Sequence, residues 1–390
     1  MSPDSYTEVT RQSCGQNIVK SCVGTLIGLV LFIAAFPLLW WNEQRSLERE
    51  QALNQGERIV VTADAAKVNP EHDGKLVYLT GDAATAQTLK DPTFGIAVKE
   101  TLRLQRMVEM YQWEEEEDER TEKEVGGGSR TVTTYTYNKT WSHNLIDSNR
   151  FKHPEGHQNP AQKPYDSLIL DAGDTRVGAF ALPQDLQAKL RKFTPYPVTE
   201  ELAAKLPAAE RQRLIVDNGR FYHGANPASP QIGDARITFS TVPQGPVSLV
   251  ARQLKDTFED YGEGNKAIHL IEQGNVSAQT LFQHAKRENL ILTWVLRGVG
   301  ALMMIIGIAL FFGPINALAN VLPFVGNITE AGTGCVAGGI GLALSLATIA
   351  VAWVTIRPLL GIPLFLVTGV LVFLVVSRGR KRKQAGSANL

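Results

Sequence analysis

Residues 21–42 read SCVGTLIGLVLFIAAFPLLWWN, with no charged residue between Lys20 and Glu43. A helix needs about 20 apolar residues to cross the hydrocarbon core of a bilayer. A cleaved signal peptide has a shorter apolar region that ends in small residues, whereas this run ends with two tryptophans. We therefore interpret residues 21–42 as an uncleaved transmembrane helix, with a buried helix of a soluble protein as the alternative.

A second apolar region, residues 290–377, contains only three charged residues, Arg297, Glu330 and Arg357. It is long enough for three further spans, which we expect at 293–313, 334–356 and 359–377. The intervening segment 314–333 contains Pro314 and Pro323, which interrupt regular helix, and its uncharged part is too short to cross the membrane. We expect 314–333 to be an interfacial or re-entrant segment.

The orientation is predicted from the tail at 378–390, which begins RGRKRK. Basic residues beside a span favour the cytoplasmic side, so this tail is expected there. Four spans are an even number, so residues 1–20 are also expected in the cytoplasm and residues 43–291 on the opposite side. The expected location is the plasma (inner) membrane of a bacterium, or the endoplasmic reticulum or inner nuclear membrane of a eukaryotic cell.

Aromatic and basic residues cluster at the non-cytoplasmic ends of the predicted spans. Tryptophan prefers the headgroup region, and long arginine side chains reach toward it. We expect these residues to contact lipid headgroups or the interface; an alternative for the two arginines is an ion pair with Glu43. They are Trp40, Trp41, Trp294, Arg297, Trp353 and Arg357.

The third span carries small residues along one helical face. Helices in a bilayer associate through close backbone approach at such faces. We predict that this face packs against another helix, with the fourth span, the second span or a neighbouring subunit as partner. The residues are Gly334, Gly338, Gly341, Ser345, Thr348 and Ala352.

The segment 43–291 has a pattern typical of a β-rich domain. Val98, Leu102, Leu104, Val108 and Met110 share one parity, which predicts a strand with one buried face. A second alternating run, 130–141, follows the turn sequence at 125–129, so we expect a hairpin centred on Gly127 with Trp113 facing Trp141. Other strands are expected at 58–61, 75–80, 236–239 and 247–252, and helices at 184–192, within 199–214 and from 278. The repeated Gly-Asp-Ala at 81–83 and 233–235 raises the hypothesis of two similar β-units.

The sequence gives little sign of catalysis or of a cofactor. The chain has no net charge, which argues against a nucleic-acid partner. It lacks the common nucleophile, metalloprotease, phosphate-loop and Cys-x-x-Cys motifs. His153 and His157 have metal-like spacing, but Pro154 and Gly156 place them in a loop. We expect neither a bound metal nor a cofactor.

Several short motifs, taken in order, resemble the LUMA (transmembrane protein 43) family. They are VEMYQW at 108–113, YTYN at 135–138 with Trp141, GHQNP at 156–160, FYH at 221–223 with Asn226-Pro227, GDAR at 233–236, VARQ at 250–253, TWVLR at 293–297 and RPL at 357–359. The likeness covers nearly the whole chain. It implies a multispan protein of internal membranes, which in animals is associated with scaffolding of lamina-linked proteins and with self-association. It implies no catalytic residues, and the composition indicates a bacterial member.

We therefore expect an α+β membrane protein with four transmembrane helices, one N-terminal and three C-terminal, and a large β-rich extramembrane domain between the first and second. The expected function is that of a non-enzymatic scaffold that self-associates and engages membrane proteins or lipids. The alternative is a membrane-bound, lipid-modifying hydrolase whose site is built from carboxylates and scattered histidines such as His143, His157 and His223.

Overall fold

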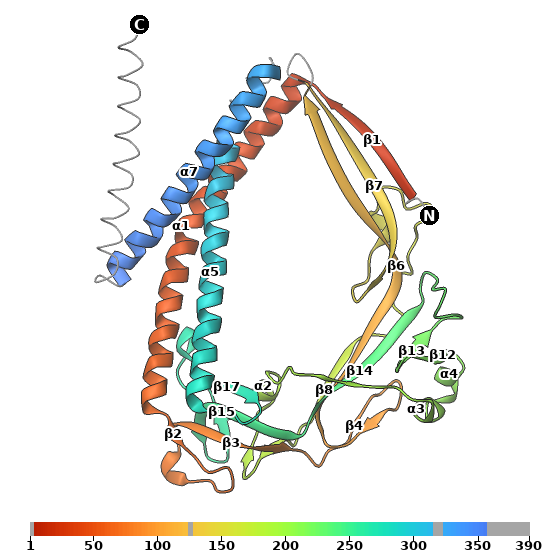
Figure 1. Cartoon of the computed structure of the whole chain (residues 1–390), viewed down its shortest axis with the longest axis vertical. Helices are drawn as coiled ribbons and strands as arrows, with labels where there is room; N and C mark the ends of the chain where they lie inside the picture. The colour runs from red at the N-terminus through yellow and green to blue at the C-terminus, as the bar shows by residue number, and fades with distance from the viewer. Residues whose placement is uncertain (1–3, 124–127, 315–322, 357–390) are drawn as a thin grey trace. The chain divides into compact units, whose positions relative to one another are not determined.

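The computed structural model describes residues 4–123, 128–314 and 323–356 (Figure 1). These residues form two compact units. The β-rich unit comprises residues 4–8, 52–119 and 133–285, and the helical unit comprises the described residues within 9–51, 120–132 and 286–356. The predicted fourth span (359–377), the basic tail (378–390) and the hairpin centre at Gly127 lie outside the described residues.

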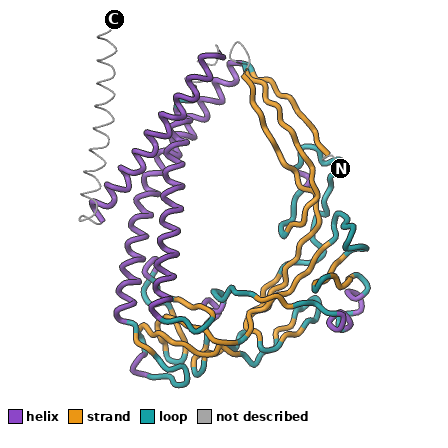
Figure 2. Tube along the Cα trace, viewed as in Figure 1, coloured by secondary structure: helices purple, strands orange, loops and turns teal. Residues whose placement is uncertain are grey.

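Two main sheets contain most of the strands in the described part of the chain (Figure 2). The eight-stranded sheet has the order β1 (Asp4–Gln12), β7 (Ser129–Ser142), β6 (Thr101–Lys123), β14 (Ala235–Pro243), β13 (Arg220–His223), β12 (Leu214–Asp217), with β11 (Thr194–Tyr196) on β14 and β8 (Leu168–Asp171) on β6. The seven-stranded sheet has the order β10 (Phe180–Ala181), β9 (Arg176–Val177), β3 (Leu76–Ala84), β15 (Gly245–Leu254), β16 (Thr257–Glu259), with β17 (Leu270–Gln273) on β15 and β2 (Val61–Thr62) on β3. A small third sheet pairs β4 (Leu89–Lys90) with β5 (Ala97–Val98).

The alternation predicted for the first long strand is confirmed in β5 and β6. Val98, Leu102, Leu104, Val108 and Met110 are all buried. The position of the same parity between Leu104 and Val108 is Arg106, which is also buried. Its guanidinium donates to both carboxylate oxygens of Asp91 at 2.8 Å, so the cation is paired where the pattern would place an apolar side chain.

The long strands β6 and β7 are neighbours, as the hairpin prediction requires, but their side chains meet two residues away from the expected register. The ring of Trp141 lies 5.0 Å from that of Tyr111, and Lys139 lies 4.6 Å from the ring of Trp113. Each of these β7 side chains therefore meets the β6 residue two positions before the one expected from a register centred on Gly127.

Several predicted element boundaries were wrong, for physical reasons. The strand expected at 58–61 is reduced to β2, because helix α1 (Cys14–Ile59) continues through Arg58. The helix expected within 199–214 is divided by Pro207 into α3 (Glu200–Ala204) and α4 (Ala208–Arg211), since proline cannot donate within a helix. The helix expected at 184–192 is the single turn α2 (Gln184–Gln187).

The two repeated Gly-Asp-Ala motifs occupy different sheets. Gly81-Asp82-Ala83 lies within β3, whereas Gly233-Asp234 precedes β14. Each main sheet has its own cluster of buried apolar residues, one around Val77 and Leu249 and one around Val108 and Phe221. Two similar β-units therefore remain a prediction.

Among the described residues, three helices are long and apolar enough to cross a membrane: α1, α5 (Ala278–Phe311) and α7 (Pro323–Ile356). Their apolar stretches lie within Val19–Ile59, Ala278–Phe311 and Gly334–Thr355, at the positions predicted for the first three spans. Helix α7 begins at Pro323, within the segment predicted to be interfacial or re-entrant.

Helices α1 and α5 make a close backbone contact at two glycines. A Cβ atom built on Gly28 would lie 2.7 Å from the carbonyl oxygen of Gly307, and one built on Gly307 would lie 2.8 Å from that of Gly28. Thr25 on the same side of α1 donates its hydroxyl to the carbonyl of Leu310 at 3.2 Å. Only glycine permits this backbone contact.

Candidate functional site

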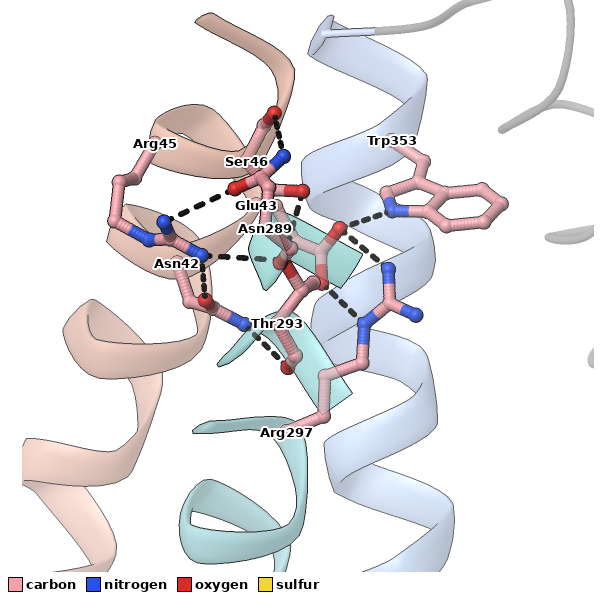
Figure 3. Close-up of polar contacts among 8 residues, drawn as sticks. All are labelled: Asn42, Glu43, Arg45, Ser46, Asn289, Thr293, Arg297 and Trp353. Atoms are coloured by element: carbon pink, nitrogen blue, oxygen red, sulfur yellow. Dashed lines mark hydrogen bonds and ion pairs between the residues drawn. The ribbon is translucent and has the colours of Figure 1, made fainter. Parts of the chain in front are cut away.

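The strongest candidate site is a group of polar side chains that joins the three apolar helices (Figure 3). Glu43 follows the uncharged run of α1, Arg297 lies on α5, and Trp353 lies near the end of α7. Arg297 donates from Nε and Nη2 to the two carboxylate oxygens of Glu43 at 2.7 and 2.9 Å. Trp353 donates its indole N–H to the second of these oxygens at 2.6 Å. We call these three residues the polar clamp.

The polar clamp is largely removed from solvent. The side chains of Glu43 and Arg297 are 4% and 14% exposed. The guanidinium of Arg297 lies 4.7 Å from the ring of Trp294 and 5.4 Å from that of Trp353, within range of cation–π attraction. The attraction between two buried opposite charges offsets the cost of removing them from water only when their geometry is good. The two-point contact between Arg297 and Glu43 meets that condition.

A second polar group connects α1 and α5 one turn away. Arg45 donates to the side-chain oxygens of Asn289 and Thr293, each at 3.1 Å, and to Asn42 at 3.4 Å. Asn42 in turn donates to the backbone carbonyl of Thr293 at 3.1 Å (Figure 3). Asn42, Arg45, Asn289 and Thr293 are buried, so this network and the polar clamp use their polar groups to hold helices together.

The structure shows where the predicted headgroup residues lie. Trp40, Trp41 and Trp294 are exposed on the helical unit, as a residue at a lipid interface would be. Arg297 forms the ion pair with Glu43 that was the alternative prediction for this residue. Trp353 also has a specific partner, because its indole N–H is bound to Glu43. Arg357 lies outside the described residues.

The predicted small-residue face of α7 divides into two parts. A Cβ on Gly341 would lie within 2.7–2.9 Å of Ile305 on α5, so this residue is at a helix contact within the chain. Ser345 and Ala352 are also buried. In contrast, a Cβ added to Gly334 or to Gly338 would have no described atom within 4 Å, so that end of the face is open. Its role in oligomerisation stays a prediction.

Apart from Glu43 and Arg297, the residues that hold α1 against α5 were not predicted from the sequence. A signal for Gly28 existed, because Gly24 and Gly28 have the small-x-x-x-small spacing in the first span. Asn42, Asn289 and Thr293 gave no comparable signal, since an amide or hydroxyl at the end of an apolar run is common. Their hydrogen bonds join α1 to α5 at positions more than 240 residues apart in the chain, and no local sequence pattern indicates such a pairing.

The three histidines considered for a hydrolase have separate surroundings. His143 is exposed, with Nε2 3.5 Å from Glu109. His157 is buried, stacked on Tyr137 at 3.8 Å, with its ring nitrogens near the carbonyl of His153 and the carboxylate of Asp4. His223 lies edge-on to Tyr165. No partner is shared among these contacts, and the described residues contain no group of three or more histidine, cysteine or acidic residues placed to hold a metal ion.

The phenol of Tyr137, beside His157, is held by two hydrogen bonds. Its hydroxyl donates to Glu115 at 2.6 Å and accepts from the backbone N–H of His153 at 3.0 Å. Burial, assisted by the hydrogen bond to the Glu115 carboxylate, raises the pKa of Tyr137 to about 12. A phenol with so high a pKa stays neutral and fixes the loop that carries His153 to the strand.

Comparison with known proteins identifies the family. The model of the family described as Transmembrane protein 43 matches residues 110–358, which include part of the β-rich domain, helix α5 and the whole of α7. The chain belongs to the transmembrane protein 43 family. It is 31% identical to Transmembrane protein 43 of Rattus norvegicus, over 88% of this chain and 87% of that protein, and 30% identical to the Homo sapiens protein, over 94% and 92%. The Drosophila melanogaster homolog is 28% identical, over 87% of this chain and 91% of the homolog.

Family membership confirms the resemblance seen in the sequence motifs. The alignment to the Homo sapiens relative covers 94% of this chain, so the similarity includes both the apolar helices and the β-rich domain. The protein is therefore a membrane protein of that family. No solved structure matches the chain.

Proposed function

We propose that this member of the transmembrane protein 43 family is a non-enzymatic membrane scaffold that self-associates and engages membrane proteins or lipids. The observation that carries the proposal is the polar clamp. A charged pair within a helix bundle is a functional-site hypothesis by default, and here the charges are bound to each other and to Trp353. They fasten three helices and leave the other faces of the bundle for partners.

The open end of the small-residue face on α7 supports the self-association. Gly334 and Gly338 present backbone that a helix from a second copy can approach closely. Exposed apolar residues such as Ile340 and Leu342 flank this face. The partners are membrane lipids, other membrane proteins and further copies of the chain, with no role for nucleic acid.

The location follows the charge pattern of the sequence. The basic tail lies on the cytoplasmic side, and the β-rich domain lies on the opposite side of the membrane. In a bacterial cell this is the inner membrane, and in a eukaryotic cell it is the endoplasmic reticulum or inner nuclear membrane.

The test is co-isolation of two differently tagged copies produced in the same cells. Membranes are solubilised, one tag is captured, and the other tag is measured. The matched control mixes membranes from cells that each carry one copy, so that exchange after solubilisation is subtracted. Recovery of the second tag only from co-producing cells is expected; equal recovery from both samples contradicts self-association.

A pair of variants connects that result to α7. Gly338→Leu fills the open end of the small-residue face without touching a described atom of the same chain. Co-isolation is expected to fall while thermal stability in detergent is retained. Ile340→Leu, at an exposed position two residues away, serves as the control. If Gly338→Leu leaves co-isolation at the wild-type level, this face is not the interface.

A further inference from the structure

An apolar groove lies between α1 and α7 in the helical unit, and it is separate from the open end of the small-residue face. Its volume is about 500 Å³, and Phe36, Pro37 and Trp40 of α1 line one wall. Leu344, Thr348 and Val351 of α7 line the other. The surface is almost wholly carbon, and the hydroxyl of Thr348 is already bound to the carbonyl of Leu344 at 2.8 Å. The groove therefore suits an apolar occupant with no need for a hydrogen bond.

We propose that this groove is the docking site for the chain's own residues 359–377. The described part of α7 extends to Ile356, and Arg357 and Pro358 lie between it and these 19 uncharged residues. Two antiparallel helices are commonly joined by two to five residues. A returning helix of this length extends about 28 Å, which is more than enough to pass the groove.

The groove is placed where a returning helix first meets α7. Val351 lies six positions before Arg357, and Thr348 and Leu344 lie farther from that residue on the same face of α7 at helical spacing. A short connection also gives the returning segment a high effective concentration at this site compared with a second copy. The inference is independent of self-association, because it concerns one chain.

The antiparallel arrangement gives a register that can be tested. Positions equally distant from the Arg357-Pro358 connection lie opposite each other, so Val351 faces Leu364 and Leu344 faces Leu371. Leu346 lies on another face of α7 and is 49% exposed, so it serves as a control position outside the groove.

The experiment uses full-length protein in native membranes, with Cys14, Cys22 and Cys335 replaced by serine. The pairs Val351→Cys with Leu364→Cys and Leu344→Cys with Leu371→Cys are oxidised, and remaining thiols are counted by the gel shift from a maleimide polymer. Loss of both thiol adducts without a dimer band is expected for each groove pair. The control pair, Leu346→Cys with Leu371→Cys, is expected to keep both adducts.

Three other results overturn the proposal. A dimer-sized band from the Val351→Cys single variant, together with no intramolecular bond in either groove pair, means that a second copy fills the groove. Retention of both thiols in both groove pairs means that lipid fills it. Equal oxidation of the groove and control pairs means that the segment has no fixed position on α7.

Discussion

Glu43 and Arg297 are 254 positions apart in the chain, yet they form a two-point ion pair with N–O distances of 2.7 and 2.9 Å. The same carboxylate accepts a hydrogen bond from Trp353 at 2.6 Å. The first apolar helix is thereby fixed to two helices that follow the β-rich domain in sequence. This relationship makes the polar clamp the part of the bundle whose disruption has the most predictable effect.

Removing one charge of the clamp is predicted to destabilise the bundle strongly. Arg297→Gln leaves the buried Glu43 carboxylate without its cation, and breaking a buried pair in this way costs about 3–5 kcal/mol. Glu43→Gln leaves the complementary charge unpaired. Thermal unfolding in detergent, followed by tryptophan fluorescence, is expected to shift to a markedly lower midpoint for each variant.

A double variant separates pairing from simple loss of a side chain. Glu43→Gln combined with Arg297→Gln removes both charges, so it is expected to be more stable than Arg297→Gln alone. Glu288→Gln, at an exposed position of the same helix α5, controls for loss of a carboxylate. Strictly additive effects of the two single changes would show that the residues do not interact.

The contact between Gly28 and Gly307 predicts a steric effect of any larger residue. Gly307→Leu places side-chain atoms where the α1 backbone lies, and relief of such overpacking costs about 1–3 kcal/mol or more. The expected outcome is a lower unfolding midpoint in detergent. Gly298→Leu makes the same chemical change on the same helix with no described atom within 4 Å, so its midpoint is expected to be unchanged or raised. Equal loss in both variants would exclude the close contact as the cause.

The high pKa of Tyr137 predicts a loss of stability in alkaline solution. In the unfolded chain this phenol titrates near its ordinary value of about 10, whereas burial and Glu115 hold its pKa at about 12 in the folded protein. Its contribution to stability is complete below about pH 10 and is lost as the pH rises to about 12. Ultraviolet titration of tyrosinate is expected to lose one late component in Tyr137→Phe. Persistence of the full late absorbance in that variant would assign the shift to other tyrosines, such as Tyr165 and Tyr222.

The N-terminal strand gives a prediction about sides of the membrane. Asp4 lies 3.0 Å from His157, and Glu8 lies 2.7 Å from Lys152, both within the β-rich unit. Because a hydrogen bond cannot cross a bilayer, these contacts predict that Ser5→Cys reacts with an impermeant thiol reagent from the same side as the exposed Ala161→Cys. That result would conflict with the placement of residues 1–20 and 43–291 on opposite sides of a membrane crossed by α1. Reaction from opposite sides would instead support the cytoplasmic position inferred from charge for residues 1–20. It would also mean that β1 does not contact residues 151–157 when the protein is in a membrane.

The sequence was sufficient for features that depend on local composition. The apolar runs located the three described spans, because span length is set by bilayer thickness. The alternation around Leu102 and Val108 located the buried face of β6, because side chains alternate across a strand. The motifs also gave the family, which the similarity to known proteins confirms.

Features that depend on distant pairing could not be predicted in the same way. Nothing near Arg106 indicates that Asp91 neutralises it, and nothing near Arg45 indicates that Asn289 accepts its hydrogen bond. A helix was expected within 199–214, but Pro207 divides this segment and the pairing of β12 with β13 sets its end. The small residues of α7 were recognised, whereas Gly28 and Gly307 were not, because a glycine contact needs two helices to be known at once.

The distance in sequence between Glu43 and Arg297 also determines how long after Glu43 its cation is synthesised. A ribosome adds about 5–20 residues per second, so about 13–50 s pass between synthesis of Glu43 and of its cation. Trp353 is made later still. Throughout this interval the first apolar helix is in the membrane or its insertion machinery with a carboxylate that has none of its final partners. The bundle is therefore completed only after the whole β-rich domain has been made. An insertion factor has most to contribute during the period in which the first helix is in place and its partner helices have not yet been synthesised.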